Sequence, residues 1–185
     1  VYAYSGYNQY NGGGKIADWV NEKTGGTAKV AIIEGLPSDY TTQRMAGFVD
    51  RCKEMYPNIE VVATQPGDWV REKGMNAAMD MLQAHPDINV IYGLSDEMAL
   101  GAVQAAKQLG RSDIIVVGLD GNPNAFESVK AGELTATLDC GPVAIGANAI
   151  LAITEALENV PREEKVIEAE TTVVDSSLVD QYIKK

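Results

Sequence analysis

Residues 114–121 read Ile-Ile-Val-Val-Gly-Leu-Asp-Gly and decide the fold class. Four consecutive apolar, β-branched residues favour a strand that is buried on both faces, as in a parallel sheet covered by helices. Similar short runs recur along the chain, and longer segments with apolar residues three or four positions apart lie between them. This alternation predicts an α/β fold with a parallel sheet flanked by helices on both faces.

The expected strands and helices alternate along most of the chain. We expect strands at residues 1–5, 29–34, 60–64, 88–92, 114–118, 134–139 and 165–174. We expect helices at about residues 13–23, 39–56, 69–84, 95–109, 123–131 and 142–159. The alternation loosens near residues 139–142, which divides the chain into a lobe at 1–140, a helix at 141–160, and a return strand with a polar tail at 161–185. Because the first residues already fit a strand, we expect the chain to be a fragment of a longer protein.

The composition argues against several classes of function. Hydrophobic residues make up 45% of the chain and charged residues 22%, which is typical of a globular domain. The sequence contains no run of the roughly 20 apolar residues that a membrane helix needs. A net charge of −11 would repel a phosphate backbone, so we expect no nucleic-acid partner. Cys52 and Cys140 lack metal-site spacing and are expected to be separate thiols, and we expect neither a metal nor a cofactor.

Polar and aromatic side chains follow the predicted strands. In an open parallel sheet, ligands bind outside the carboxyl ends of the strands, so these side chains should converge on one rim. The candidates provide an aromatic ring, a guanidinium, a carboxylate and small polar groups, at Trp69, Arg44, Asp120, Ser95 and Asn8. An aromatic ring suits the C–H face of a sugar, and charged donors and acceptors suit its hydroxyls. The loops therefore predict a site for a sugar or polyol.

Some of these residues also have purely structural interpretations. Trp69 opens a predicted helix and could simply cover the core. Arg44 could pair with Asp39 or Glu34. Asp96 begins another predicted helix, and because Asp is favoured at helix N-termini, we expect it to be an N-cap and not a ligand contact.

Four short stretches of the sequence match motifs of a known family. They are Arg44–Phe48, Gln65–Trp69, Ser95–Gly101 and Val116–Gly121. In this order they resemble the ribose-binding-protein family of periplasmic sugar-binding proteins, which have the type I fold and serve ABC transporters. The resemblance implies that Arg44 donates to sugar oxygens, that Trp69 stacks on the sugar and that Asp120 accepts from hydroxyls.

The resemblance also covers three weaker site positions. Ser95 and Cys140 stand where ribose binders have Asn and Gln, and they are implied ligand contacts. Asn8 lies where the family has an Asp-Asn pair, which is altered here. Leu119 replaces a frequent aromatic residue. These departures leave the sugar open to another pentose, a hexose or a polyol.

Family members have two lobes that close on the ligand. The resemblance implies that residues 1–140 are the C-terminal-type lobe and that the helix at 141–160 normally belongs to a missing N-terminal lobe. The apolar face of this helix would then lack its usual partner. The implied partners are a sugar or polyol, the membrane permease of an ABC transporter, and the missing lobe. The implied location is periplasmic or extracellular, with a lipid anchor if the source is Gram-positive.

Two other kinds of function stay open. The effector-binding domain of a LacI-type transcription regulator and a sugar-sensing receptor domain share the fold. An α/β enzyme that acts on a sugar is the alternative from a different class, but we expect no enzyme. His85, the only histidine, lies in a predicted turn on the opposite rim, which removes His-dependent nucleophilic machinery. The run Gly12–Lys15 lacks the spacing of a phosphate-binding loop.

Overall fold

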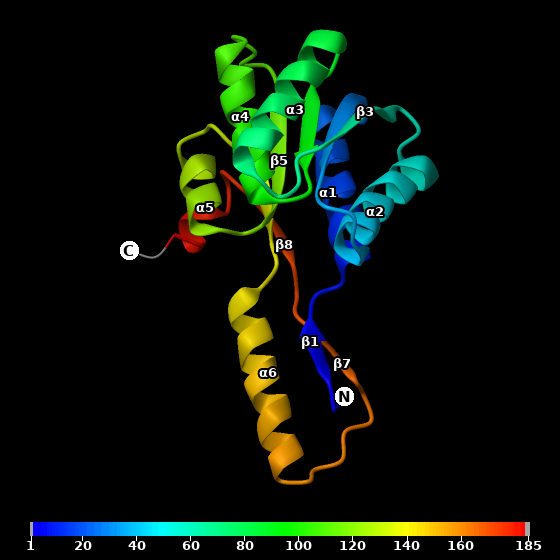
Figure 1. The fold of residues 1–185 in the computed structure, drawn as a ribbon, viewed down its shortest axis with the longest axis vertical. Coiled ribbons are helices and arrows are strands. Elements are labelled where there is room, and N and C mark those ends of the chain that lie inside the picture. The colour runs from blue at the N-terminus through cyan, green and yellow to red at the C-terminus, as the bar shows by residue number, and fades with distance from the viewer. Residues whose placement is uncertain (1, 184–185) are drawn as a thin grey trace.

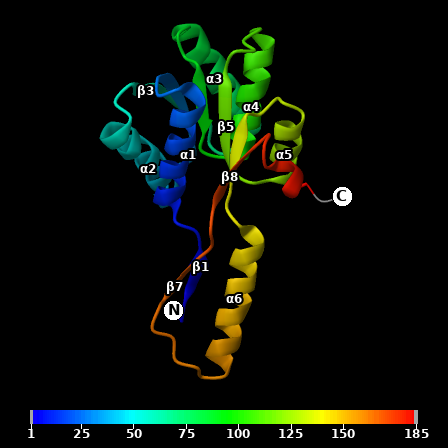
Figure 2. The same cartoon turned by 180° about the vertical axis from the view of Figure 1, so that it is seen from behind.

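The computed structural model describes residues 2–183 and has two parts (Figure 1). The main lobe is a six-stranded sheet with helices on both faces. A narrower unit extends from one end of the lobe and consists of β1 (Tyr4–Gly6), α6 (Pro142–Leu157) and β7 (Val166–Glu168). We call these three elements the protruding unit. Figure 2 shows from behind that α6 and the two short strands run side by side, away from the main sheet.

The main sheet has the strand order β3-β2-β4-β5-β6-β8. Its members are β2 (Ala28–Glu34), β3 (Ile59–Pro66), β4 (Val90–Gly93), β5 (Ile115–Asp120), β6 (Ala136–Asp139) and β8 (Thr172–Asp175). Neighbouring strands pair in parallel, except that β8 is antiparallel to β6. The predicted α/β class with a parallel sheet flanked by helices is therefore confirmed, and only the edge strand β8 runs antiparallel to its neighbour.

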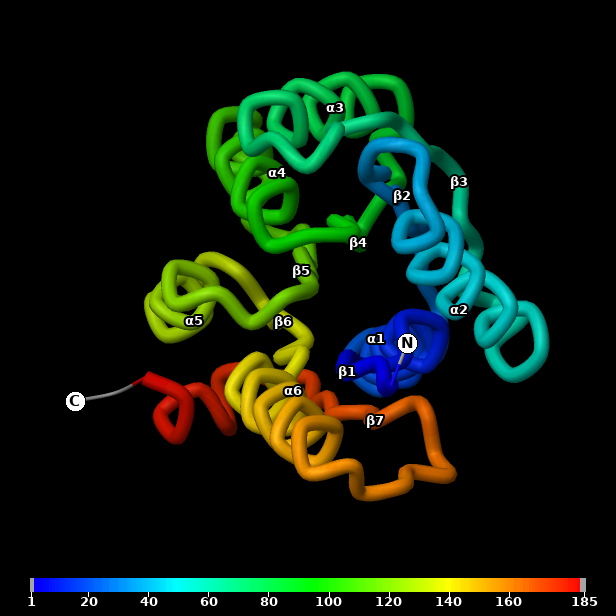
Figure 3. The backbone as a smooth tube through the Cα atoms, turned by 60° about the horizontal axis from the view of Figure 1, so that its bottom comes forward, coloured from blue at the N-terminus to red at the C-terminus, as the bar shows by residue number. Residues whose placement is uncertain are grey.

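The helices form two layers around the main sheet (Figure 3). One layer consists of α1 (Gln9–Thr24) and α2 (Asp39–Met55), which pack against each other. The other layer consists of α3 (Arg71–Ala84), α4 (Asp96–Gln108) and α5 (Pro123–Lys130), with the short 3-10 helix η1 (Val179–Gln181) beside α5. The sheet between them is the core, and side chains such as Ile32, Ile91 and Val117 are fully buried. None of the helices within residues 2–183 is long and apolar enough to cross a membrane.

Two expected strands differ from the observed ones. The strand expected at 165–174 is two strands, because the chain passes from the protruding unit to the main lobe at Ala169–Thr171. Strand β7 pairs with β1, and β8 pairs with β6. The first strand, expected at 1–5, is β1 in the protruding unit and does not join the main sheet, while Val1 lies outside the described residues.

The glycines at residues 12–14 allow two helices to approach closely. They lie in α1, where a Cβ on Gly13 would overlap the carbonyl oxygen of Arg44 in α2. A Cβ on Gly47 of α2 would overlap the carbonyl oxygen of Tyr10 in the same way. A Cβ on Gly14 would lie 3.8 Å from its nearest neighbour, the carbonyl oxygen of Gly47, which is an ordinary contact. Gly13 and Gly47 therefore serve helix packing, and they set how near Arg44 lies to α1.

Helix α6 leaves most of its apolar side chains exposed. Val143, Ile150 and Leu157 are 81%, 68% and 79% exposed, and Ala152 is the only buried residue of the helix. The helix packs on β1, where the Ser5 hydroxyl donates to the carbonyl oxygen of Ile145 at 2.9 Å. An apolar face of this size on a helix is typical of a surface that another element covers.

Gly13→Ala and Gly14→Ala form a matched pair that tests the helix contact. We expect Gly13→Ala to lower the free energy of unfolding by about 1–3 kcal/mol, because α1 and α2 must separate. We expect Gly14→Ala to raise it by up to about 1 kcal/mol, because alanine favours the helix and finds room. Urea unfolding followed by circular dichroism measures both changes. Equal effects of the two substitutions would show that the close approach does not limit packing.

Candidate functional site

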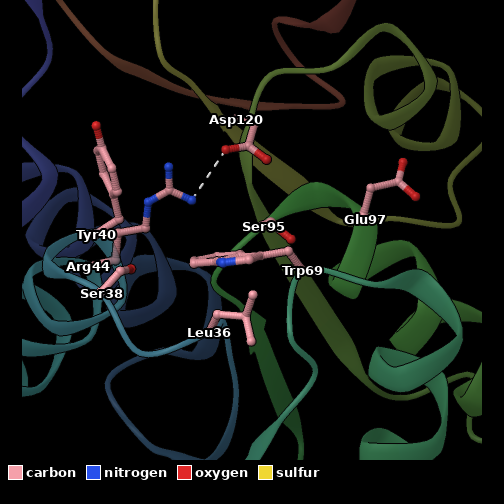
Figure 4. Close-up of a pocket in the computed structure, with 8 residues that line it drawn as sticks. All are labelled: Leu36, Ser38, Tyr40, Arg44, Trp69, Ser95, Glu97 and Asp120. Atoms are coloured by element: carbon pink, nitrogen blue, oxygen red, sulfur yellow. Dashed lines mark hydrogen bonds and ion pairs between the residues drawn. The ribbon is translucent and has the colours of Figure 1, made fainter.

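A cavity of about 550 Å³ lies at the carboxyl ends of strands β2 to β5 (Figure 4). Its lining residues follow these four strands and are Leu36, Ser38, Tyr40, Arg44, Trp69, Ser95, Glu97 and Asp120. The strand order places β2 beside β4. The chain leaves β2 through α2 on one face of the sheet and leaves β4 through α4 on the opposite face. Ligands of open α/β sheets bind at such a reversal of strand order. The cavity is therefore where the fold favours a ligand.

Arg44 and Asp120 form an ion pair at the base of the cavity. The Nη1 atom of Arg44 lies 3.3 Å from Oδ1 of Asp120, and the arginine is only 8% exposed. Nη1 also donates to the carbonyl oxygen of Leu94, at 2.5 Å. The alternative pairing of Arg44 with Asp39 or Glu34 is therefore not the one observed. The pair places donors and an acceptor side by side with little net charge.

Trp69 lies across the middle of the cavity with its ring edge-on in Figure 4. Asp68 and Trp69 have φ angles of 51° and 66°, a left-handed conformation that is uncommon for residues with a side chain. The ring lies against Gly35, where any Cβ would overlap it, and its centroid is 5.5 Å from Cζ of Arg44. Trp69 does not open a helix as expected, because α3 begins at Arg71. The unusual backbone turns the ring into the cavity.

Asp120 is also held in an uncommon backbone conformation, with a φ of 144°. Its Oδ2 atom accepts from the backbone N–H of Asp96 at 3.4 Å. Burial raises the pKa of Asp120, and the Arg44 guanidinium opposes this rise. Residues in sparsely populated conformations concentrate at functional sites, where surrounding contacts compensate for their cost. Three such residues, Asp68, Trp69 and Asp120, lie in or beside this cavity.

The expected N-cap role of Asp96 is wrong. Ser95 is the N-cap of α4, and its hydroxyl accepts from the backbone N–H of Met98. Asp96 is fully buried behind the cavity, where it accepts from the Thr137 hydroxyl and from the backbone N–H of Asn122. Burial raises its pKa to about 7, although both hydrogen bonds oppose the rise. Asp96, which follows β4, therefore links the end of β5 and strand β6 by hydrogen bonds behind the cavity.

Two predicted site residues do not line the cavity. Asn8 is the N-cap of α1, where its side chain accepts from the backbone N–H of Asn11 at 3.0 Å and donates to Glu168 at 3.3 Å. Cys140 is buried next to the cavity, 7% exposed, and burial raises the pKa of its thiol to about 12. Asn8 lies outside the cavity because its side chain caps α1, and the short Cys140 side chain ends inside the protein. Cys52 and Cys140 are both free, as expected.

Four cavity residues were not among the predicted site residues. Leu36, Ser38 and Tyr40 belong to the loop after β2, which was expected at this rim but offered no distinctive residue pattern. Glu97 lies in the first turn of α4, and both of its carboxylate oxygens accept from Arg71, at 2.8 and 3.0 Å. No local pattern indicated this pairing, because Arg71 begins a different helix. Glu97 marks the edge of the cavity toward α3.

Residues 1–160 match the model of the periplasmic binding protein domain family. The chain belongs to this family. Ribose import binding protein RbsB of Salmonella typhimurium is 39% identical over 156 residues, which cover 83% of this chain and 51% of that protein. The D-allose-binding periplasmic protein of Escherichia coli is 35% identical over 175 residues, which cover 91% and 55%. The chain thus spans about half the length of the curated relatives it matches.

Solved structures of periplasmic binding proteins agree with this membership. A periplasmic solute-binding protein of an ABC transporter from Actinobacillus succinogenes, with bound D-allose, has a TM-score of 0.92 and 35% identity. The match covers 97% of this chain and 64% of that one. The binding protein of an arabinose transporter from Shewanella has a TM-score of 0.88 and 31% identity, with 95% and 60% covered. The resemblance to the ribose-binding kind of protein is therefore confirmed, and these relatives are binding proteins and not enzymes.

Asp96→Asn tests the buried carboxyl through the pH dependence of stability. The pKa of Asp96 is raised from 3.8 to about 7, so between these pH values the native state keeps a proton that the unfolded chain has lost. The free energy of unfolding should therefore fall as pH rises through this window, by up to about 1.4 kcal/mol per pH unit. Asparagine can bond Thr137 and Asn122 without titrating. The stability of the wild type relative to the variant should fall between pH 4 and pH 7 and then level off.

Asp113→Asn is a control for which the expected pH dependence of stability has the opposite sign. Arg111 lowers the pKa of the exposed Asp113 carboxyl, so its contribution is present at neutral pH and is lost toward acid. Urea unfolding at several pH values measures both variants. A wild-type stability that rises relative to Asp96→Asn between pH 4 and pH 7 would contradict the buried, proton-retaining carboxyl.

Proposed function

We propose that this chain is the sugar-binding lobe of an ABC-transporter solute-binding protein and that it recognises a neutral monosaccharide or polyol. The observation that carries the proposal is the cavity in which the Trp69 ring, the Arg44 guanidinium and the Asp120 carboxylate face a common space. An aromatic face, charge-assisted donors and a charged acceptor are the groups that a ring of hydroxyls needs. The sugar and polyol names of the relatives support the same class of ligand.

Each cavity residue has a proposed role. The exposed part of the Trp69 ring stacks on the C–H face of the sugar, and Leu36 supports the ring from the other side (Figure 4). Arg44 donates to a hydroxyl or ring oxygen, and Asp120 accepts from a hydroxyl. Ser95 contributes a small polar group at the cavity wall. Because the charges of Arg44 and Asp120 offset each other, a neutral ligand fits better than an anion or a cation.

A second lobe would complete this site. The cavity opens at the end of the sheet from which the protruding unit extends, and α6 exposes an apolar face there. We propose that residues 1–140 form the ligand-binding lobe and that the helix at 141–160 packs on the other lobe. Residues 161–185 then return the chain to the ligand-binding lobe. One lobe provides part of the contacts to a sugar, so this chain alone should bind weakly.

The biological setting follows from the same proposal. The relatives' names favour import over a LacI-type regulator or a receptor, and the proposed partner is the membrane permease of an ABC transporter. We propose a periplasmic or extracellular location, with a lipid anchor in a Gram-positive source. We also propose that the chain is not an enzyme. His85 lies at the end of α3, away from the residues that line the cavity.

Calorimetric titration of this chain with D-ribose, D-allose and xylitol tests the proposal. We expect weak binding of at least one of them, and no binding of L-glutamate as a charged control. Trp69→Ala should weaken sugar binding about tenfold, because stacking and apolar burial are lost. Trp69→Phe should keep most of the affinity, because a ring remains.

Trp19→Phe is the matched control, since this second tryptophan lies on α1 and donates to Asp175. It should leave sugar affinity unchanged. Sugar binding that survives Trp69→Ala undiminished, or no sugar binding even at high millimolar concentration, would contradict the proposed site. Sub-micromolar binding by this chain would contradict the need for a second lobe.

A further inference from the structure

The Arg44 side chain is held partly by residues that do not line the cavity. Its Nε atom donates to Oε1 of Gln9 at 2.8 Å, and its Nη2 atom donates to the Tyr7 hydroxyl at 2.7 Å. Its Nη1 atom donates to the carbonyl oxygen of Leu94 and to Asp120. These four bonds use four of the five N–H groups of a guanidinium. Among the described residues, one N–H on Nη2 is left for a further acceptor.

Gln9 and Tyr7 are buried behind Arg44, 7% and 8% exposed. They come from the segment that leads from β1 of the protruding unit into α1 of the main lobe. The Tyr7 ring also lies 5.9 Å from Cζ of Arg44. Both residues therefore hold the guanidinium, and they do so from the segment that joins the two parts of the molecule.

This support has a physical purpose. An arginine side chain loses considerable rotamer entropy when it is fixed, and its fork binds well only when it is already oriented. Arg44 keeps its orientation because Gln9 fixes the Nε edge and Tyr7 fixes one Nη2 hydrogen. The edge toward Asp120 and the cavity is then presented in one geometry. Without these acceptors, buried N–H groups would seek other partners, with Asp120 the nearest charged one.

We propose that Gln9 and Tyr7 are positioning residues that orient Arg44 toward Asp120 and thereby set the affinity of the cavity without touching the ligand. The effect on affinity rests on the proposed function, whereas the effect on the orientation of Arg44 does not. The two parts can therefore be measured separately.

Gln9→Leu and Tyr7→Phe each remove one acceptor from Arg44 and nearly preserve shape. We expect each variant to weaken binding of D-ribose or D-allose about tenfold, with the Trp69 ring still in place. Gln9→Glu, which keeps an acceptor for Nε, should restore most of the affinity. The matched controls are Gln108→Leu on the exposed side of α4 and Tyr10→Phe, whose hydroxyl bonds Asp50; both should bind as the wild type does.

The Nε–Hε resonance of Arg44 reports on how its guanidinium is held, independently of sugar binding. Arg44→Lys assigns this signal in a ¹H–¹⁵N spectrum. In the wild type and in Gln9→Glu it should be shifted and slow to exchange with water, and in Gln9→Leu it should move and exchange fast. If the wild type binds no sugar, the proposed function fails, and this signal alone decides on the positioning role.

Two results would overturn the proposal. One is wild-type sugar affinity in both Gln9→Leu and Tyr7→Phe. The other is an Arg44 Nε–Hε signal that is the same in Gln9→Leu as in the wild type. A loss of unfolding free energy in these variants together with wild-type sugar affinity would show that Gln9 and Tyr7 serve only to satisfy a buried charge.

Discussion

The buried positive charge of Arg44 is the constraint on which the site depends. A guanidinium that is 8% exposed must be paired and hydrogen-bonded, or its burial would cost several kcal/mol. Its partners come from three separate segments: the entry to α1, the loop after β4 and the end of β5. Its own helix α2 must lie close to α1 for these bonds to form. The glycine contact between α1 and α2 brings Arg44 within reach of Gln9 and Tyr7. The need to pair the Arg44 charge therefore constrains how α1, α2, β4 and β5 meet at the end of the sheet.

The parallel sheet turns this packing into a binding surface. Because the strands run in the same direction, the residues that follow β2 to β5 share one edge. Trp69 and Asp120 adopt uncommon backbone conformations there, and the surrounding contacts stabilise them: Gly35 leaves space for the indole, and the backbone N–H of Asp96 donates to Asp120. The outcome is an aromatic face beside a compensated ion pair. This arrangement suits neutral hydroxyl groups, which can both donate to the carboxylate and accept from the guanidinium.

Local patterns in the sequence predicted the fold class and the edge of the sheet that carries the cavity, because buried β-branched runs and helical spacing are local signals. They also led to Arg44, Trp69, Ser95 and Asp120, which the structure brings to one cavity. That Ser95 and not Asp96 caps α4 could not be foreseen, since the Asp96 side chain is held by Thr137 on a strand far along the chain. The division of residues 165–174 into β7 and β8 likewise depends on distant partners, β1 and β6. Gln9 and Tyr7 carried no sequence signal, because their role is visible only through Arg44.

The central claim is that the cavity beside Trp69 receives a sugar, and the two tryptophans of the chain allow a direct test. A ¹H–¹⁵N titration with D-ribose and D-allose follows the indole N–H signals of Trp69, in the cavity, and of Trp19, which donates to Asp175 on the far side of the lobe. The account predicts saturable shifts of the Trp69 indole and of the backbone amides after β2, β4 and β5, with the Trp19 indole unmoved. Shifts centred on Trp19, or a Trp69 signal that never moves while the sugar binds elsewhere, would contradict it.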